Sequence, residues 1–83
     1  MTINVKMPDG INIVPLLVEG SDTIYNVKGM ITNLEHIPRR HQELVFMEQT
    51  LDNDHKLKDY SVEDGSVLDL VLFIIKWGSY LVA

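Results

Sequence analysis

The segment that decides the fold is residues 21–38, which read SDTIYNVKGMITNLEHIP. Its first residues, Ser21-Asp22-Thr23, supply side chains that can cap the N-terminus of a helix. Apolar residues then follow at spacings of three and four, the pattern of one helix face: Ile24, Val27, Ile31 and Leu34. Pro38 ends the helix near Ile37, because the residue before a proline disfavours helical backbone. The segment therefore predicts one amphipathic helix.

Residues 1–19 predict a hairpin of two strands. Residues 1–7 form the first strand, and Pro8-Asp9-Gly10 is a turn sequence because proline presets φ and glycine accepts positive φ. The return strand spans residues 11–19, with three inward candidates: Ile13, Leu16 and Val18. Their spacing breaks the period of two, so we expect a bulge near Val14-Pro15. Pro15 cannot donate a ladder hydrogen bond, which places this strand at a sheet edge.

The segment after the helix predicts two further strands joined by turns. Glu43-Leu44-Val45-Phe46 is a short strand, and Leu51 and Leu57 anchor the turn-rich stretch that follows. Asp64-Gly65-Ser66 precedes the last strand, Val67 to about Ile74, whose apolar run indicates burial on both faces. The order of elements predicts one α+β domain, with a single helix on one face of a mixed sheet.

Composition limits the classes of function. The 83 residues carry a net charge of −5, include no cysteine, and hold their only adjacent basic pair at Arg39-Arg40. Disulfides and thiolate metal sites are excluded, and without a basic face we expect no nucleic-acid partner. The N-terminus lacks the apolar run of a signal peptide, and the last strand is far shorter than the roughly 20 residues of a membrane helix. We therefore expect no membrane partner.

No catalytic or metal-binding pattern emerges, and we predict neither enzymatic activity nor a cofactor. The three histidines, His36, His41 and His55, lie on different predicted elements without metal-ligand spacing. No Ser/His/Asp arrangement can be defended from order alone. Asp52-Asn53-Asp54 lacks the distal glutamate and the glycine spacing of a calcium loop and is interpreted as a polar turn. Arg39-Arg40 is interpreted as a solvated corner, with contact to an anionic partner as the alternative.

With these elements placed, residues 1 to about 72 resemble the ubiquitin family, with one added residue in the second strand. The resemblance is carried by residues 1–6 with Gly10, Ser21-Asp22-Thr23-Ile24, Asn26-Val27-Lys28, Ile37-Pro38, Gln42, Leu44-Val45-Phe46, Leu51, Leu57, Asp59-Tyr60 and residues 68–72. It implies a β-grasp roll with sheet order 2-1-5-3-4. It also implies a ubiquitin-like domain at residues 1–73, an apolar extension at residues 74–83, and an intracellular protein of the cytoplasm or nucleus.

Two positions inside this fold depart from the family pattern. His36 stands where ubiquitin-like folds often end the helix with a glycine at positive φ, and a non-glycine there should cost on the order of 1 kcal/mol. Lys28 matches a semi-buried lysine that the family pairs with an aspartate. Asn53 holds that partner position here, so we expect a flanking carboxylate, Asp52 or Asp54, to pair with Lys28.

The residues that support conjugation in the family are mostly replaced. Conjugation uses a C-terminal Gly-Gly, whereas Lys76-Trp77 occupies those positions and the single Gly78 is followed by Ser79. Among the lysine positions that link ubiquitin chains, only Lys6 and Lys28 are matched. The resemblance therefore implies a ubiquitin-like domain that is not itself conjugated.

The family's apolar recognition patch is retained in part. Val45 and Val71 match two aliphatic positions, while Pro8 replaces a loop leucine and Asp69 replaces a histidine. The predicted patch consists of Val45, Val71, Asp69, Met47, Gln49 and Pro8, with Met47, Gln49 and Asp69 near its rim. A carboxylate there favours cationic partners. We predict an interaction domain of a ubiquitin- or proteasome-linked protein that binds protein partners, either helices of the ubiquitin-binding type or proteasome receptors.

The apolar residues after Leu72 leave alternatives open. A small domain should not expose many large apolar groups, and the candidate tail interface is Phe73, Ile75 and Trp77. This tail can extend the last strand, pack on the domain, contact another domain or mediate self-association. The alternatives to an interaction domain are a covalent modifier, disfavoured by the missing Gly-Gly, and an assembly domain that uses its tail as the interface.

Overall fold

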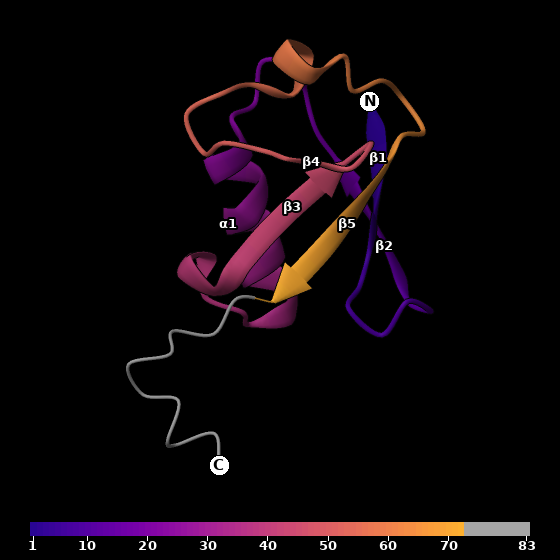
Figure 1. The fold of residues 1–83 in the computed structure, drawn as a ribbon, viewed down its shortest axis with the longest axis vertical. Coiled ribbons are helices and arrows are strands. Elements are labelled where there is room, and N and C mark those ends of the chain that lie inside the picture. The colour runs from indigo at the N-terminus through magenta and orange to yellow at the C-terminus, as the bar shows by residue number, and fades with distance from the viewer. Residues whose placement is uncertain (73–83) are drawn as a thin grey trace.

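The computed structural model describes residues 1–72, which form a five-stranded mixed sheet with one long helix packed against it (Figure 1). The strands are β1 (Thr2–Lys6), β2 (Ile13–Leu17), β3 (Gln42–Phe46), β4 (Gln49–Thr50) and β5 (Val67–Leu72). The helices are α1 (Ile24–Glu35) and the short 3₁₀ helices η1 (Arg39–His41) and η2 (Leu57–Tyr60). The sheet order is β2-β1-β5-β3-β4, with β1 and β5 parallel and the other pairs antiparallel. The predicted α+β β-grasp architecture and its strand order are confirmed.

Strand β2 corrects two of the expectations for the return strand. Its pairing with β1 is continuous from one end to the other, so the bulge expected near Val14-Pro15 is absent from the pairing. Ile13 faces away from the core and is 52% exposed. The residues that reach the core alternate strictly: Val14, Leu16 and Val18. The prediction was wrong because it placed Ile13 in the core. A period of two that includes Leu16 and Val18 places Val14 there instead. Pro15 does lie on an edge strand, as predicted.

The turn between β1 and β2 forms at the predicted residues. Gly10 has φ 72°, and its N–H donates to the carbonyl of Met7 at 2.9 Å. The Asp9 carboxylate accepts the backbone N–H groups of Asn12 at 2.9 Å and Ile11 at 2.8 Å. These bonds lower the pKa of Asp9 because they favour the charged carboxylate. The turn is therefore stabilised by the Asp9 side chain as well as by the positive φ of Gly10.

Helix α1 begins and ends near its predicted boundaries. The N–H of Asn26 donates to Oγ1 of the N-cap residue Thr23 at 3.1 Å. The C-cap residue His36 adopts the left-handed conformation at φ 61°, and its N–H donates to the Thr32 carbonyl. Leu34 is 55% exposed, which corrects its assignment to the buried stripe. At about 100° per residue it lies at one edge of the stripe, in the last turn of α1, and the three other stripe positions are buried: Ile24, Val27 and Ile31.

The hydrophobic core lies between α1 and one face of the sheet. Leu68 and Leu70 of β5 enter it, whereas Val67 and Val71 point away and are each 46% exposed. The expectation that β5 is buried on both faces was therefore wrong, because α1 covers a single face of the sheet. The remaining core residues are Ile3, Val5, Leu16, Val18, Ile24, Val27, Ile31, Leu44, Leu51, Leu57 and Val62.

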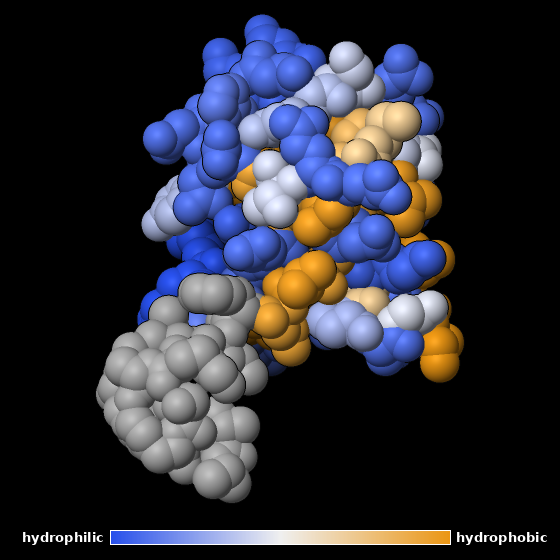
Figure 2. Space-filling view, viewed as in Figure 1, coloured by the Kyte–Doolittle hydropathy of each residue, from blue (hydrophilic) through white to orange (hydrophobic). Residues whose placement is uncertain are grey.

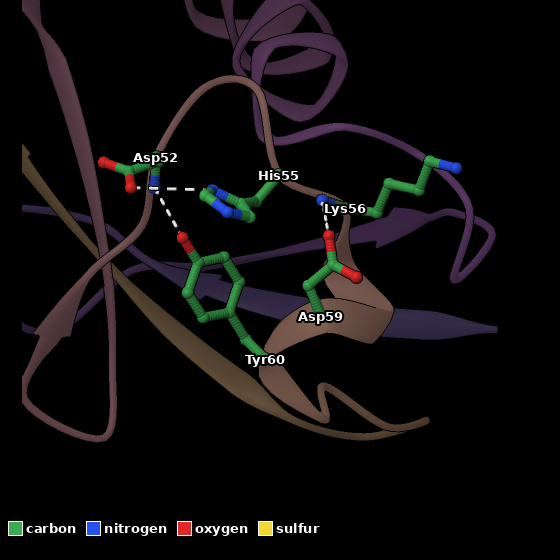
Figure 3. Close-up of polar contacts among 5 residues, drawn as sticks. All are labelled: Asp52, His55, Lys56, Asp59 and Tyr60. Carbon is green, nitrogen blue, oxygen red and sulfur yellow. Dashed lines mark hydrogen bonds and ion pairs between the residues drawn. The ribbon is translucent and has the colours of Figure 1, made fainter.

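The chain between β4 and η2 is fastened by polar contacts within itself (Figure 3). The N–H of Asp52 donates to the Tyr60 hydroxyl at 2.9 Å, and the N–H of Lys56 donates to Asp59 Oδ2 at 2.8 Å. His55 Nδ1 lies 3.5 Å from Asp52 Oδ2, and its ring meets Tyr60 edge-on. These contacts join the start of the loop to η2, and they give Asp52 and His55 a structural role.

Lys28 pairs with an amide instead of a carboxylate. Its side chain is 6% exposed, and Nζ donates to Asn53 Oδ1 at 2.7 Å. The expectation that Asp52 or Asp54 would take this role was wrong, because Asn53 itself keeps the partner position. Burial lowers the pKa of Lys28, while the charges of Glu43 and Asp52 act in the opposite direction.

The predicted extension at residues 74–83 and the tail candidates Phe73, Ile75 and Trp77 lie outside the described residues. The domain boundary after residue 73 therefore stays a prediction.

Candidate functional site on the open face of the sheet

The face of the sheet turned away from α1 carries the predicted recognition residues. We call it the open face, and its central outward residues are Lys6, Glu43, Val45, Val67, Asp69 and Val71. Strand pairing places Val45 opposite Asp69 and Glu43 opposite Val71. Side chains opposite one another on an antiparallel pair lie within about 5 Å, so these residues form one surface. Figure 2 views this side of the molecule, and apolar groups there alternate with hydrophilic ones over β3 and β5.

Asp69 lies at the middle of the open face and not at its rim. It is on β5, the central strand, where the register sets it between Lys6 of β1 and Val45 of β3. No ion pair within 4.0 Å joins Asp69 to Lys6 in residues 1–72. An exposed carboxylate beside two aliphatic side chains therefore remains available to a cation from outside.

Met47 lies beside this surface on a strained turn. Met47 and Glu48 join β3 to β4, and both have positive φ, 52° and 66°. Two such residues in a two-residue hairpin loop are characteristic of a type I′ turn, which favours Asn and Gly. Met47 is 83% exposed, the most exposed large apolar side chain of the described residues. The turn thus leaves a long apolar side chain exposed two residues after Val45.

The two remaining predicted patch residues, Gln49 and Pro8, are not directly opposite Val45 or Val71 in the strand pairing. Gln49 pairs with Phe46, whereas Thr50 pairs with Val45, so Thr50 is the β4 residue directly opposite Val45. Pro8 lies on the β1–β2 turn, where it helps to line a shallow hollow of about 500 Å³ that reaches Leu72. Membership of Gln49 and Pro8 in a binding patch stays a prediction.

Three apolar residues of the same face were missed from the sequence. Ile13, Leu17 and Val67 are 52%, 78% and 46% exposed and point outward from β2 and β5. Anchoring the period of two on Val14 would have found the first two. They widen the apolar part of the open face toward the β2 edge.

The open face is suited to recognition by contact. It offers aliphatic area that a partner can bury, at roughly 25 cal/mol per Å², and a carboxylate that can select a cationic partner. Within residues 1–72 no group of three or more His, Cys, Asp or Glu residues could hold a metal ion. The same part of the chain contains no helix long and apolar enough to cross a membrane.

A mixed sheet of this order folded around one helix, with an open face of exposed aliphatic residues, defines the ubiquitin-like β-grasp class. Comparison with known families agrees: the model of the ubiquitin family matches residues 3–73. The chain therefore belongs to the ubiquitin family, whose members are generally not enzymes and engage protein partners.

Three relatives show the range of proteins that this chain is similar to. It is 44% identical over 55 residues to the NEDD8-like protein RUB3 of Arabidopsis thaliana, which covers 66% of this chain and 70% of the relative. It is 36% identical over 72 residues to the ubiquitin-like protein NEDD8 of Dictyostelium discoideum, covering 87% of this chain and 92% of the relative. It is 39% identical over 57 residues to AN1-type zinc finger protein 4 of Mus musculus, covering 69% of this chain and 8% of that protein.

Proposed function

We propose that this chain is a ubiquitin-like interaction domain that is not itself conjugated and that acts inside the cell, in the cytoplasm or nucleus. Its partners are proteins of the ubiquitin or proteasome pathways, and it binds them through the open face. The observation that carries the proposal is the cluster of Val45, Val71 and Asp69 on neighbouring strands β3 and β5. Val71 is 46% exposed and Asp69 is exposed, so a partner reaches both without any rearrangement.

The mechanism is the docking of a partner helix or loop across β3 and β5. Apolar partner side chains bury the aliphatic surface of Val45 and Val71, with Met47 closing over one side. A lysine or arginine of the partner pairs with Asp69, which gives a charge-assisted hydrogen bond and rejects acidic partner segments. Because Glu43 also lies on this face, opposite Val71, the preference for basic partners is strengthened.

The sequence after Leu72 supports the non-conjugated role. Bulky residues stand where the family places its terminal glycines, with Lys76-Trp77 at the Gly-Gly positions. The second candidate function, a covalent modifier, draws support from the NEDD8-like relatives. Incubation of the 83-residue chain with an activating enzyme and ATP separates the two. A thioester adduct would overturn the non-conjugated role.

Two valines of β5 provide a matched test of the binding surface. Val71 and Val67 are each 46% exposed on the same face, but only Val71 belongs to the predicted patch. In a titration of isotope-labelled chain with a basic-flanked helical peptide of the ubiquitin-binding type, we expect resonance shifts around Val45 and Val71. Val71→Asp and Val45→Asp should abolish binding, while Val67→Asp should leave most of it. Shifts confined to other surfaces, or equal losses from all three variants, would contradict the proposed patch.

A further inference from the structure

Arg39, on the α1 side of the molecule, is an exposed arginine held in one position. Its Nε donates to the backbone carbonyl of Tyr25 at 3.1 Å. Its Cζ lies 4.2 Å from the centre of the Tyr25 ring, a cation–π contact. An exposed arginine normally samples many rotamers, and ordering its side chain costs conformational entropy. The contacts with Tyr25 offset this entropic cost in the free protein, before a partner binds.

Gly29 makes room for the same guanidinium. A Cβ added at Gly29 would lie 2.8 Å from Arg39 Cζ, closer than atoms in contact can approach. Glycine inside a helix is less favourable than alanine, and Gly29 lies in the interior of α1. The chain therefore keeps an unfavourable helix residue at the point where Arg39 rests on the helix.

The positive charges of Arg39 and Arg40 form no ion pairs among residues 1–72. Within residues 1–72 no carboxylate lies within 4.0 Å of Arg39 or Arg40, although the whole chain has a net charge of −5. Beyond the bond from Nε, neither guanidinium makes a side-chain hydrogen bond in this part of the chain. Nη2 of Arg39 rests against α1 at Gly29, whereas Nη1 of Arg39 and the guanidinium of Arg40 have no hydrogen-bond partner among residues 1–72.

These donors line a hollow between α1, η1 and the loop after β4. Its volume is about 410 Å³, and its lining residues are Tyr25, Thr32, Arg39, Arg40 and Asn53. Asn53 uses Oδ1 to accept from Lys28, which leaves its amide N–H groups to donate. The hollow therefore combines two guanidinium groups, an amide donor and an aromatic ring, and none of its lining residues within 1–72 is acidic.

We propose that this hollow binds a carboxylate side chain from an acidic segment of a protein partner. Nη1 of Arg39 and the guanidinium of Arg40 can donate charge-assisted hydrogen bonds to a carboxylate, and the fixed position of Arg39 lowers the entropic cost of doing so. A net charge of −5 strongly repels a long polyanion such as nucleic acid, whereas a short segment with a few carboxylates is repelled much less. The site lies on the helix side of the domain and is independent of the open face, so the domain can engage partners on both sides.

The test uses the isotope-labelled 83-residue chain and an oligoglutamate peptide, with oligoglutamine and phosphoserine peptides as comparisons. We expect oligoglutamate to shift the resonances of Tyr25, Thr32, Asn53 and the Arg39 side chain, and to bind less tightly as salt is raised. Arg39→Gln should weaken binding about tenfold or more, because it removes the charge-assisted bonds. Lys58→Gln, which removes one positive charge from exposed η2, should leave the affinity nearly unchanged.

Gly29→Ala separates a built site from a simple charge effect. This variant keeps both arginines and favours the helix, but it displaces the Arg39 guanidinium. We expect it to weaken oligoglutamate binding nearly as much as Arg39→Gln does. Full affinity in Gly29→Ala, equal loss in Lys58→Gln, equal binding of oligoglutamine, or binding of the phosphoserine peptide alone would each overturn the proposal.

Discussion

The two faces of β5 are made from similar residues but have different roles. Leu68 is completely buried against α1, while Val67 and Val71, on the other face of the same strand, are each 46% exposed. All three are aliphatic, so hydrophobicity does not distinguish them. Their surroundings do, because α1 covers one face of the sheet and leaves the other open. Residues on the covered face are constrained by packing, and residues on the open face are available for binding.

Two aliphatic residues of β5, one on each face, test this comparison with the largest expected effect. Leu68→Ala removes a fully buried side chain and leaves a cavity, so it should lower the free energy of unfolding by about 2–5 kcal/mol. Val71→Ala truncates a side chain that is 46% exposed on the open face, and should cost less than about 1 kcal/mol. Urea denaturation of both variants measures the difference. Similar losses would mean that the two faces are not distinct in packing.

Several elements of the fold were predictable from the sequence, because the residues that specify them act on nearby backbone. Thr23 caps α1 with its side-chain hydroxyl, Gly10 supplies a positive φ, and Pro15 marks an edge strand because it lacks a backbone N–H. Each residue acts on its own backbone or on the backbone a few residues away. The errors arose where the outcome depends on another element. Ile13 differs from Val14 only through the register that β1 imposes.

The two candidate sites also differ in how far the sequence could predict them. Val45, Asp69 and Val71 were chosen by resemblance, and the alternation of the strands places them on one face. Of the hollow beside Arg39, the sequence revealed only the adjacent basic pair Arg39-Arg40. Its form depends on Gly29 and Tyr25, ten or more residues away in sequence, and no local pattern indicates that contact.

Gln42 sharpens the comparison because it is a polar residue on the covered face. It is 2% exposed, and its Nε2 donates to the Ile37 carbonyl at 2.8 Å and to the Lys28 carbonyl at 3.1 Å. Gln42→Ala leaves buried carbonyls without these donors, so it should lower the free energy of unfolding by about 1–3 kcal/mol. Gln49→Ala on exposed β4 is the control and should change stability by less than about 0.5 kcal/mol. Equal effects in thermal or urea unfolding would assign Gln42 no special role.

Lys28 and Asn53 lie at the margin of the covered side, where a charge can be added. Asn53→Asp places a carboxylate beside the Lys28 ammonium, replacing a neutral acceptor with a charged one. We expect the variant to be more stable near neutral pH by about 1 kcal/mol, as judged by urea denaturation. The same substitution puts an acid in the hollow beside Arg39, so it should also weaken binding of oligoglutamate.

The pH dependence checks that the gain comes from Lys28. Burial lowers the pKa of Lys28 below its ordinary 10.5, so the unfolded chain binds this proton more tightly than the folded chain. In the original chain, stability from this group therefore rises as the pH increases from the lowered pKa toward 10.5. Asn53→Asp raises the folded pKa, so its advantage should be complete below that window and shrink within it. An advantage that is independent of pH, or that persists in a Lys28→Met background, would assign the gain to another cause.

The smallest expected effect lies on the open side, at the turn between β3 and β4. Glu48 has φ 66°, a conformation that glycine adopts without the steric cost borne by other residues. Glu48→Gly should therefore raise the free energy of unfolding by about 0.5–1 kcal/mol, even after the greater freedom of glycine in the unfolded chain is subtracted. Glu19→Gly is the control, because Glu19 is exposed and is not among the residues with positive φ. It should be neutral or destabilising, and the same result for Glu48→Gly would argue against strain in the turn.

Partner binding by the Glu48→Gly variant then tests what the strained turn contributes. Glycine allows the turn more conformations, so Met47 would be held less firmly beside Val45. If the variant is more stable yet binds a helical partner less tightly, the strain serves to orient Met47 on the open face. If both stability and affinity rise or stay level, Met47 acts as a flexible apolar contact and the turn geometry is incidental to binding. Either result separates the two faces further, since no substitution on the covered side is expected to change affinity for a helical partner of the open face.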